Sequence, residues 1–376
     1  MTMTKKSEDN EAKMRKFLQL HILTSYPPAN LNRDDLGRPK TAVFGGQPRL
    51  RISSQSLKRA WRTSSVFEEK LGGIDFESDQ GIRTKRFGRE VYRRLIDGNV
   101  KEKDATAWAR DIADQFGKIK SDKKDYPENL DIEQIAFISP AERTAVFDLI
   151  EKLIKENKSP TPDDLKLLRH ENSAADIAMF GRMLADATAY KVEAAVQVGH
   201  AISVQKIAIE DDYFTAVDDL NKGEDDAGAG HLGEREFASG LFYLYINIDR
   251  ELLFKNLAGA SEKQREIYEN SMKALVEAAA TVAPTGMQNS FGSRARASYI
   301  MAELGNQQPR NLSLAYIEPV TPVGKDGIDK KAIHAIQELR DQMDAAYDKC
   351  SDEVVEMDVR AKKGTLADII QFSVKD

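Results

Sequence analysis

The order of strand-like and helix-like segments is the feature that most restricts how this 376-residue chain can fold. Residues 17–25, 201–209 and 298–304 have strand character, and residues 237–248 (FASGLFYLYINI) are rich in aromatic and β-branched side chains. Apolar residues recur at helical spacing over residues 55–65, 261–282 and 327–349. With a long helical block at residues 66–190 set aside, the order up to residue 304 is strand, helix, strand, strand, helix, strand.

This βαββαβ order is the plan of ferredoxin-like domains, which RNA-recognition (RRM-like) domains share. We therefore predict an α+β core domain assembled from residues 14–65, 191–209 and 237–376. Residues 66–190 would be a helical insertion, with helices over 105–116, 141–156 and 174–187. Residues 210–236 would form a protruding hairpin, and residues 1–13 a disordered tail. Residues 30–48 are expected to be a long loop, a kind of segment that is usually functional or disordered.

Positive charge is concentrated in residues 33–62, although the whole chain carries a formal net charge of −6. Eight basic residues and two acidic residues give this segment a net charge of +6, which leaves −12 for the rest of the chain. A second basic cluster occupies residues 83–94. Such a distribution attracts anions locally and repels them elsewhere, so a nucleic-acid partner is compatible with the acidic total.

The predicted helix at residues 55–65 combines an apolar face with basic residues. Leu57 and Trp61 are four residues apart and share one face, while Lys58 and Arg62 share the neighbouring face. At the helix start, free backbone N–H groups and polar side chains favour phosphate. This arrangement suits a sugar-phosphate backbone and carries no base code. The alternative is a solvated helix face beside a mobile loop.

The hairpin insertion has the opposite charge. Residues 210–226 contain eight acidic residues and one lysine, so this segment cannot hold phosphate. Its apolar residues Tyr213, Phe214 and Val217 are expected to meet a base or another protein, and the alternative is a disordered loop. The aromatic run at residues 242–245 is expected to belong to the core rather than to stack on bases.

Common enzyme signatures do not occur. The chain has no GxxxxGK[ST] phosphate loop, no HExxH zinc helix and no GxSxG elbow, and its five histidines are scattered. We therefore expect no catalytic residue, no metal site and no cofactor. Asp34 and Asp35 leave a metal-dependent nuclease centre open, with salt bridges to neighbouring arginines as the simpler explanation. No apolar run approaches the ~20 residues that cross a bilayer, so a cytoplasmic protein without membrane contact is expected.

Several motifs resemble one known family. The segment LNRDDLGRPKTAVFGGQPRLRISSQSLKRAWR (residues 31–62) resembles the N-terminal signature of the CasC-type backbone subunit of the type I-E CRISPR Cascade complex. Further blocks match in order: MFGRM (179–183), HAISVQ and FTAVDDL (within 200–220), and HLGEREFASGLFYLY (231–245). Weaker blocks are PTGMQNSF and LSLAYIEPV. The resemblance spans most of the chain and is weakest in residues 66–190 and after residue 321.

The resemblance implies a right-hand architecture and a non-catalytic role in antiviral defence. The core domain would be a palm, the helical insertion the fingers and the hairpin a thumb. The subunit would bind CRISPR guide RNA (crRNA), and about six copies would stack head to tail along it as an open helix. With other Cascade subunits, they would present the RNA for pairing with target DNA. Each thumb would wedge through the RNA–DNA hybrid and flip out one nucleotide.

The resemblance also implies roles for individual residues. RNA phosphates would be contacted by Arg33, Lys40, Ser53, Gln55, Lys58, Arg59 and Arg62, and a second RNA-binding loop would carry Gln288 and Asn289. Met183, Phe214 and Thr215 would lie at the displaced nucleotide. Relatives commonly carry lysine where this chain has Met287. Related subunits in other CRISPR types cut RNA with a loop aspartate, so an RNA-cleaving subunit using Asp34 or Asp35 is one alternative, and a monomeric RNA-recognition module is another.

Overall fold

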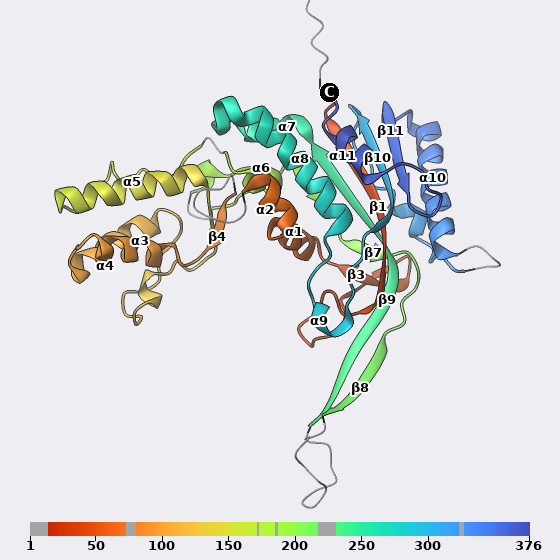
Figure 1. Ribbon diagram of the computed structural model, residues 1–376, viewed down its shortest axis with the longest axis horizontal. Coiled ribbons are helices and arrows are strands. Elements are labelled where there is room, and N and C mark those ends of the chain that lie inside the picture. The colour runs from red at the N-terminus through yellow and green to blue at the C-terminus, as the bar shows by residue number, and fades with distance from the viewer. Residues whose placement is uncertain (1–13, 73–79, 171–172, 185–186, 217–230, 323–326) are drawn as a thin grey trace, which may run out of the picture. The chain divides into compact units, whose positions relative to one another are not determined.

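The computed structural model describes residues 14–72, 80–170, 173–184, 187–216, 231–322 and 327–376 (Figure 1). The chain divides into two compact units. The first comprises Met1–Trp61, Val198–Asn247 and Val276–Asp376, and the second comprises Arg62–Gln197 and Ile248–Leu275. The expected tail at residues 1–13 lies outside the described residues, and the expected domain boundaries stay a prediction.

Both units contain strands and helices. The strands are β1 (Phe17–Ala29), β2 (Thr41–Phe44), β3 (Gln47–Ile52), β4 (Ile82–Thr84), β5 (Ala136–Ile138), β6 (Val196–Val198), β7 (Ala201–Ser203), β8 (Glu210–Ala216), β9 (His231–Asp249), β10 (Ala297–Gly305) and β11 (Glu353–Asp358). The α-helices are α1 (Ser54–Arg62), α2 (Ser65–Leu71), α3 (Phe87–Asp97), α4 (Glu102–Asp114), α5 (Pro140–Glu156), α6 (Ala175–Phe180), α7 (Arg250–Asn256), α8 (Gln264–Thr281), α9 (Gln288–Phe291), α10 (Ile328–Tyr347) and α11 (Leu366–Ser373). Short 3-10 helices are η1 (Glu128–Leu130), η2 (Thr188–Tyr190), η3 (Ala258–Lys263) and η4 (Ser313–Tyr316).

A large sheet organises the first unit. Its strand order is β11-β10-β1-β9-β7-β3-β2, and β6 and β8 also pair with β9. Antiparallel pairing joins β1 to β10, β10 to β11, β7 to β9, β3 to β7 and β2 to β3. The fold is therefore α+β, with strands from three distant chain segments in one sheet. The strand predicted at residues 201–209 is shorter in the structure, where β7 ends at Ser203.

Strand β1 lies inside the sheet and is buried on both faces. Leu18, Leu20 and Ile22 are buried as expected from their alternation, but so are the intervening Gln19 and His21. Buried polar groups must be hydrogen-bonded, and these are. The side-chain oxygen of Gln19 accepts from the hydroxyl of Tyr245 at 2.9 Å, and the His21 ring lies 2.9 Å from the Tyr243 hydroxyl.

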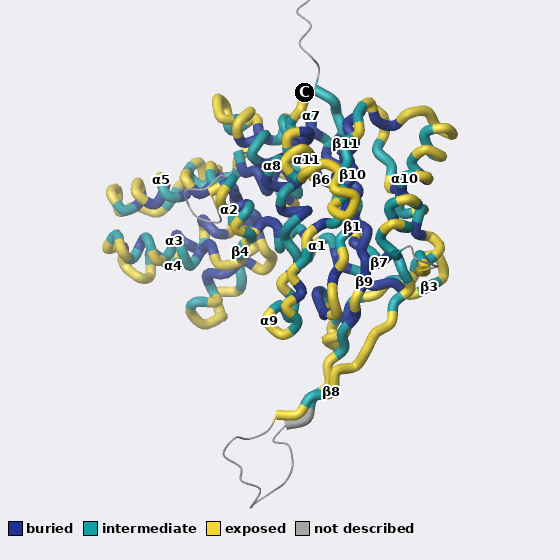
Figure 2. Tube along the Cα trace, turned by 45° about the vertical axis from the view of Figure 1, so that its right-hand side comes forward, coloured by how far each residue is buried: buried dark blue, intermediate teal, exposed yellow. Residues whose placement is uncertain are grey.

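Helix α10 covers one face of this sheet. Its Ala332, Ile336 and Leu339 pack in one apolar cluster with sheet residues that include Leu23 and Tyr243. The interpretation of residues 242–245 as core is confirmed, because none of these four residues is exposed. Figure 2 shows the contrast between these buried strands and the largely exposed β8–β9 hairpin.

The expected loop at residues 30–48 contains a hairpin, which corrects the sequence prediction. Strands β2 and β3 pair around Gly45 and Gly46, both with positive φ angles. A Cβ atom at Gly45 would lie 1.7 Å from the carbonyl oxygen of Ile317, so the turn packs tightly on another backbone segment. Arg49 of β3 is fully buried and donates to the carbonyl oxygens of Val204 and Tyr316 at 2.8 and 2.9 Å. It therefore holds the sheet together and cannot meet a ligand.

The second unit is mainly helical, as expected, with a two-stranded sheet of β4 and β5. Helices α4 and α5 match the predicted helices at 105–116 and 141–156, and their apolar faces share a core that includes Trp108 and Leu149. Ser139 and Glu142 form a capping box at the start of α5, next to a proline in its first turn. The predicted helix at 174–187 is shorter, because α6 ends at Phe180 before Gly181. Within the described residues, no helix is long and apolar enough to cross a membrane.

Candidate nucleic-acid interface

The loop after β1 is held in shape by its own polar side chains. Oδ1 of Asp34 accepts hydrogen bonds from the backbone N–H groups of Leu36 and Arg38, both at 2.9 Å. Asp34 therefore shapes the turn, which corrects the expectation that it pairs with a neighbouring arginine. The predicted contact residue Arg33 is exposed, as is Asp35.

Backbone hydrogen bonds bring Lys40 and Arg51 close to the start of α1. The N–H of Lys40 donates to the carbonyl of Asn32, and the N–H of Arg51 donates to the carbonyl of Lys40, both at 2.8 Å. The Asn32 side-chain oxygen accepts from the N–H of Ser53 at 2.9 Å. Asn32, Lys40 and Arg51 line one small pocket. Across the described ranges, neither Lys40 nor Arg51 has a carboxylate partner.

His200 lies next to these cations, just before β7. Its Nδ1 accepts a hydrogen bond from the backbone N–H of Ser54 at 2.9 Å. An imidazole nitrogen that accepts carries no proton, so the neutral ring has its proton on Nε2. His200 is largely exposed, but partial desolvation, and then the positive charges of Arg51 and Lys40, lower its pKa, which favours the neutral ring at neutral pH. We call Asn32, Lys40, Arg51 and His200 the basic corner.

Three backbone donors at the start of α1 are already used by the protein. The N–H of Ser53 bonds to Asn32, the N–H of Ser54 bonds to His200, and the N–H of Ser56 bonds to the Ser53 hydroxyl at 3.3 Å. Ser53 is buried and caps the helix. Among the described residues, the N–H of Gln55 has no hydrogen-bond partner. The expected set of free N–H groups at the helix start is thus reduced to this one, and the exposed side chains are the other donors for a ligand.

Helix α1 presents part of the predicted cationic face. Leu57 and Trp61 are buried, as predicted, whereas Gln55 and Arg59 are exposed and Lys58 is half-buried. Burial lowers the pKa of Lys58. The helix thus offers an amide and two basic side chains on the side that does not pack.

Arg62, the last residue of α1, belongs to the second unit and forms its contacts there. Its Nε donates to the carboxylate of Asp176 at 2.7 Å, and its Nη2 donates to the carbonyl of Gly81 at 3.2 Å. Both partners and Arg62 itself are buried, and the guanidinium also lies 4.8 Å from the centre of the Phe137 ring. The prediction that Arg62 shares an exposed basic face with Lys58 is therefore wrong.

The loop that carries Gln288 and Asn289 packs against the chain leading to the basic corner. A Cβ atom at Gly286 would lie 2.2 Å from the carbonyl oxygen of Leu31. The Gln288 side chain faces the backbone N–H groups of Ser293 and Arg294, and its oxygen can accept from them at 3.0 and 3.1 Å. Gln288 therefore shapes this loop, while Asn289 is exposed.

The β8–β9 hairpin carries an aromatic platform. Phe214 pairs with Gly233 across the two strands, and a Cβ atom at Gly233 would lie 2.2 Å from the Phe214 ring. The guanidinium of Arg235 lies 4.5 Å from the centre of the same ring, a distance typical of cation–π contacts. Thr215 and Tyr213 are exposed. The hairpin thus holds Phe214 in one position, while Val217 and the acidic residues that follow lie outside the described residues.

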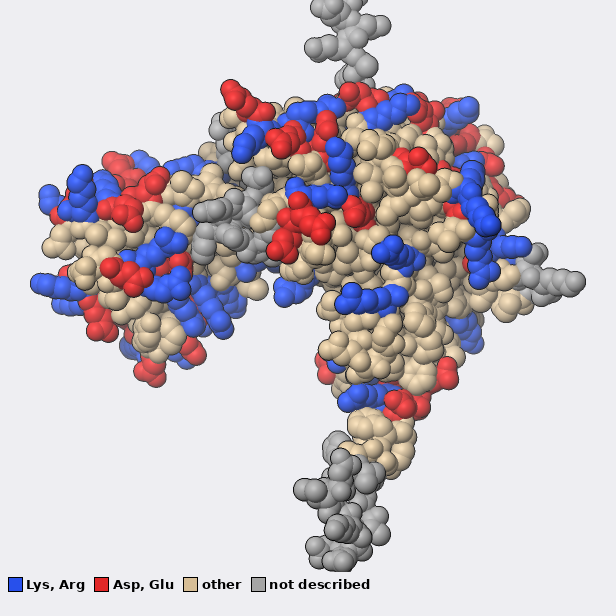
Figure 3. All heavy atoms as spheres, viewed as in Figure 1, with Lys and Arg blue, Asp and Glu red and all other residues tan. Residues whose placement is uncertain are grey.

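The base of this hairpin is tied to the loop after β1. Nε of Arg38 lies 3.1 Å from a carboxylate oxygen of Glu236, and the Asn30 amide donates to the carbonyl of Glu236 at 3.0 Å. Figure 3 shows basic and acidic side chains side by side on the protruding hairpin. Met183 belongs to the second unit, where it is 75% exposed, so its predicted place beside the hairpin stays a prediction.

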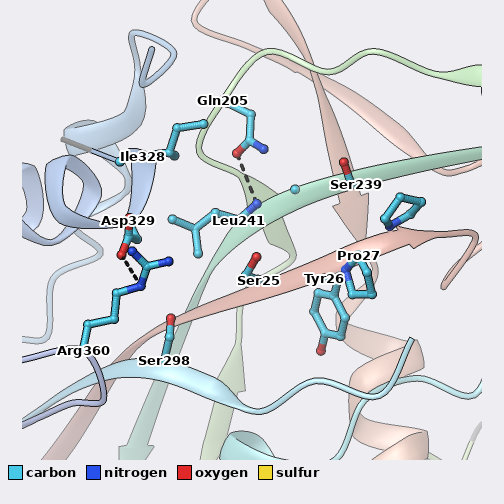
Figure 4. A pocket seen from close by; sticks show the side chains of 13 residues that line it. Ser25, Tyr26, Pro27, Gln205, Ser239, Leu241, Ser298, Ile328, Asp329 and Arg360 are labelled. Carbon is cyan, nitrogen blue, oxygen red and sulfur yellow. Dashed lines mark hydrogen bonds and ion pairs between the residues drawn. The ribbon is translucent and has the colours of Figure 1, made fainter. Parts of the chain in front are cut away.

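A separate pocket of about 610 Å³ opens on the first unit (Figure 4). Arg360 points toward Asp329 at its edge, with 3.0 Å between Nε and the carboxylate, and the Gln205 oxygen accepts from the N–H of Leu241 at 3.2 Å. None of the predicted site residues lines this pocket. In the part of the chain that the structure describes, no three His, Cys, Asp or Glu side chains gather as a metal site.

Comparison with known proteins places the chain in a family. Residues 18–374 match the family model described as "CT1975-like protein". No protein in the curated set matches the chain. A chain of a solved "CRISPR RNA-guided surveillance complex, pre-nicking" has a TM-score of 0.78 and 27% identity, covering 95% of this chain and 99% of that chain. A chain of another "CRISPR RNA-guided surveillance complex" has a TM-score of 0.69 and 22% identity with the same coverage, and it shows the fold alone. The chain belongs to the CT1975-like protein family.

Proposed function

We propose that this chain is a non-catalytic backbone subunit of a CRISPR surveillance complex and that it binds the guide RNA. The observation that carries the proposal is the likeness to a chain of an RNA-guided surveillance complex, at a TM-score of 0.78 and over nearly the full length of both chains. The sequence blocks at residues 31–62 and 231–245 favour the type I-E Cascade form. The basic corner adds a physical reason, because cations without a carboxylate partner among the described residues, together with neutral donors, suit a sugar-phosphate backbone.

We extend the proposal to the architecture. In a βαββαβ domain of the ferredoxin-like type, the first strand lies between the third and the last. The order β10-β1-β9-β7 supports such a palm, with α1 and α8 as its connecting helices. The helical second unit would then be the fingers, and the β8–β9 hairpin the thumb.

The proposed RNA contacts follow from which side chains are exposed. Arg33, Gln55 and Arg59 are exposed, Lys40 and Lys58 are half-buried, and Asn289 is exposed on the second loop. Ser53, Arg62 and Gln288 would support these residues from within the protein. Phe214 and Thr215 of the thumb, with Met183 of the fingers, would meet the displaced nucleotide of the RNA–DNA hybrid.

The proposed partners are the guide RNA, target DNA, further copies of this chain and other Cascade subunits in the cytoplasm. A head-to-tail contact between copies is heterologous, so repetition produces an open helix whose length the RNA can set. On this basis, about six copies along one guide RNA are proposed.

Co-purification with a guide array tests the proposal. We expect the chain, expressed with its array, to retain spacer-length RNA, and we expect the double variant Lys58→Ala/Arg59→Ala to retain less of every guide. Backbone contacts are independent of sequence, so losing two of them should lower the slope of log affinity against log salt by about two. The matched control is Lys349→Ala, an exposed basic residue between α10 and β11.

Two results would contradict this function. Bound RNA of random origin and length would exclude a guide-binding role. Cleavage of complementary RNA with Mg²⁺, present in the assembled complex and lost in Asp35→Ala, would favour the RNA-cleaving alternative. Asp34 is unsuited to that test, because its loss would also alter the turn that it holds.

A further inference from the structure

We propose that His200 binds a non-bridging phosphate oxygen of the guide RNA as a neutral hydrogen-bond donor, in a subsite that it shares with Lys40 and Arg51. The inference rests on the proposed function and specifies one of its contacts. Neither His200 nor Arg51 was identified as a site residue from the sequence.

The donor on His200 is fixed by the fold. Because Nδ1 accepts from the N–H of Ser54, the proton of the neutral ring is on Nε2. The ring is exposed, and within the described ranges Nε2 has no protein partner. Ser54 thus selects the tautomer, and the ring offers one N–H outward.

The neighbouring cations make this donor specific for an anion. The side chains of Lys40 and Arg51 reach the same corner, and both act on the ring electrostatically. No carboxylate neutralises either cation in the described part of the chain. Two positive charges and one neutral N–H in the same corner match a phosphodiester, which carries one negative charge and offers two free oxygens.

The surroundings of His200 in the basic corner also favour the neutral form of its ring over the protonated form. Protonation would place a proton on Nδ1, opposite the N–H of Ser54, and would add a third positive charge beside Arg51 and Lys40. The histidine therefore contributes a hydrogen bond without releasing a counterion, whereas each cation releases one. The salt dependence of binding therefore distinguishes the contribution of His200 from the contributions of Lys40 and Arg51.

Binding of guide RNA to the purified chain, measured at several salt concentrations, tests the inference. We expect His200→Ala to weaken binding about three- to tenfold, with no change in the slope of log affinity against log salt. Arg51→Gln should weaken binding and also lower that slope by about one. His200→Gln should bind nearly as the parent does, because its amide can accept from Ser54 and donate to phosphate.

Double variants distinguish contact from a purely structural role. If both groups bind one phosphate, the losses from His200→Ala and Arg51→Gln combine less than additively, whereas those from His200→Ala and Arg59→Gln simply add. Strong coupling to Arg59→Gln would mean that His200 only holds α1, and this would overturn the inference. So would a lower salt slope or unchanged binding in His200→Ala, provided that the parent chain binds. A parent chain that binds no guide RNA would overturn the proposed function itself.

Discussion

At the scale of single residues, the centre of the sheet contains a charged network. The His21 ring lies 3.1 Å from a carboxylate oxygen of Glu303, which also receives hydrogen bonds from Arg310 at 2.9 Å and from the Ser351 hydroxyl at 3.0 Å. Burial lowers the pKa of His21. Burial opposes ionisation of Glu303, but its hydrogen bonds and the charge of Arg310 outweigh burial and lower its pKa. The directions of the two pKa shifts favour a neutral histidine and an ionised glutamate in this network.

This network predicts loss of stability in mild acid. Below the ordinary histidine pKa of ~6.5, His21 is protonated in the unfolded chain but stays neutral in the folded chain. The free energy of unfolding therefore falls as pH falls. Urea unfolding between pH 7.5 and 5 should show this decline. His21→Gln should lose ~1–3 kcal/mol at pH 7.5 and show a smaller decline. His334→Gln is the control, since His334 is 80% exposed; equal declines in all three proteins would contradict the role of His21.

Single residues also show where sequence reasoning succeeds and fails. Spacing along one helix predicted that Leu57 and Trp61 are buried. It could not predict that Arg62 is buried, because its partner Asp176 is 114 residues away in sequence. His200 was missed for a similar reason, since the N–H that fixes its tautomer is 146 residues away. Local periodicity contains no information on such pairs.

At the scale of elements, the β2–β3 hairpin could have been predicted and was not. TAVF and QPRLRI flank a Gly-Gly pair, which is a strong signal for a two-residue hairpin turn. By contrast, no local pattern predicts that this turn packs on the carbonyl of Ile317, because that contact joins residues far apart in sequence. The aromatic segment at residues 237–248 was correctly predicted as a strand, and β9 begins earlier because its first residues pair with β8.

The β8–β9 hairpin predicts a cost for adding a single methyl group. Gly233→Ala places a Cβ against the Phe214 ring, so the ring or the strand must move, and overpacking of this kind costs ~1–3 kcal/mol. We expect faster amide hydrogen exchange in β8 of this variant. Glu234→Ala, an exposed neighbour on the same strand, should exchange as the parent does. Equal exchange rates in the two variants would show that the position of the Phe214 ring does not require a glycine at residue 233.

At the scale of the whole molecule, the distribution of charge matters more than its sum. The exposed Asp211 and Asp212 on β8 repel phosphate, whereas the second unit has exposed basic residues such as Lys85 and Arg86. Opposite charges fix the register of repeating contacts. The acidic residues Asp218 and Asp219, which we also expect to contribute, lie outside the described residues.

If copies assemble as proposed, charge reversal on the β8–β9 hairpin should weaken that assembly. We expect Asp211→Lys/Asp212→Lys to form shorter assemblies on guide RNA, measured as mass per complex, because the proposed contact of the hairpin with basic residues of the next copy would then bring like charges together. The control is Asp352→Lys, which reverses a partly exposed charge next to β11. Assemblies of full mass in the thumb variant would mean that other surfaces fix the spacing.

The structure groups Ile248–Leu275 with the mainly helical unit, and this grouping is not encoded in the periodicity of the sequence. Membership of a unit depends on which surfaces pack together, whereas periodicity reports only that a helix has an apolar side. The aromatic strand continues through that boundary without any change in pattern.

The pairing of β1 with β10 has a consequence for synthesis of the chain. Phe17 lies opposite Gly305 in the sheet, so the first strand leaves the ribosome long before this partner exists. At ~5–20 residues per second, the wait is on the order of 15–60 seconds. The residues of the helical core between Phe87 and Leu184 emerge during this interval and can fold first. A nascent chain stalled before β10 would expose β1, with its unpaired backbone and apolar side chains, as a target for chaperones.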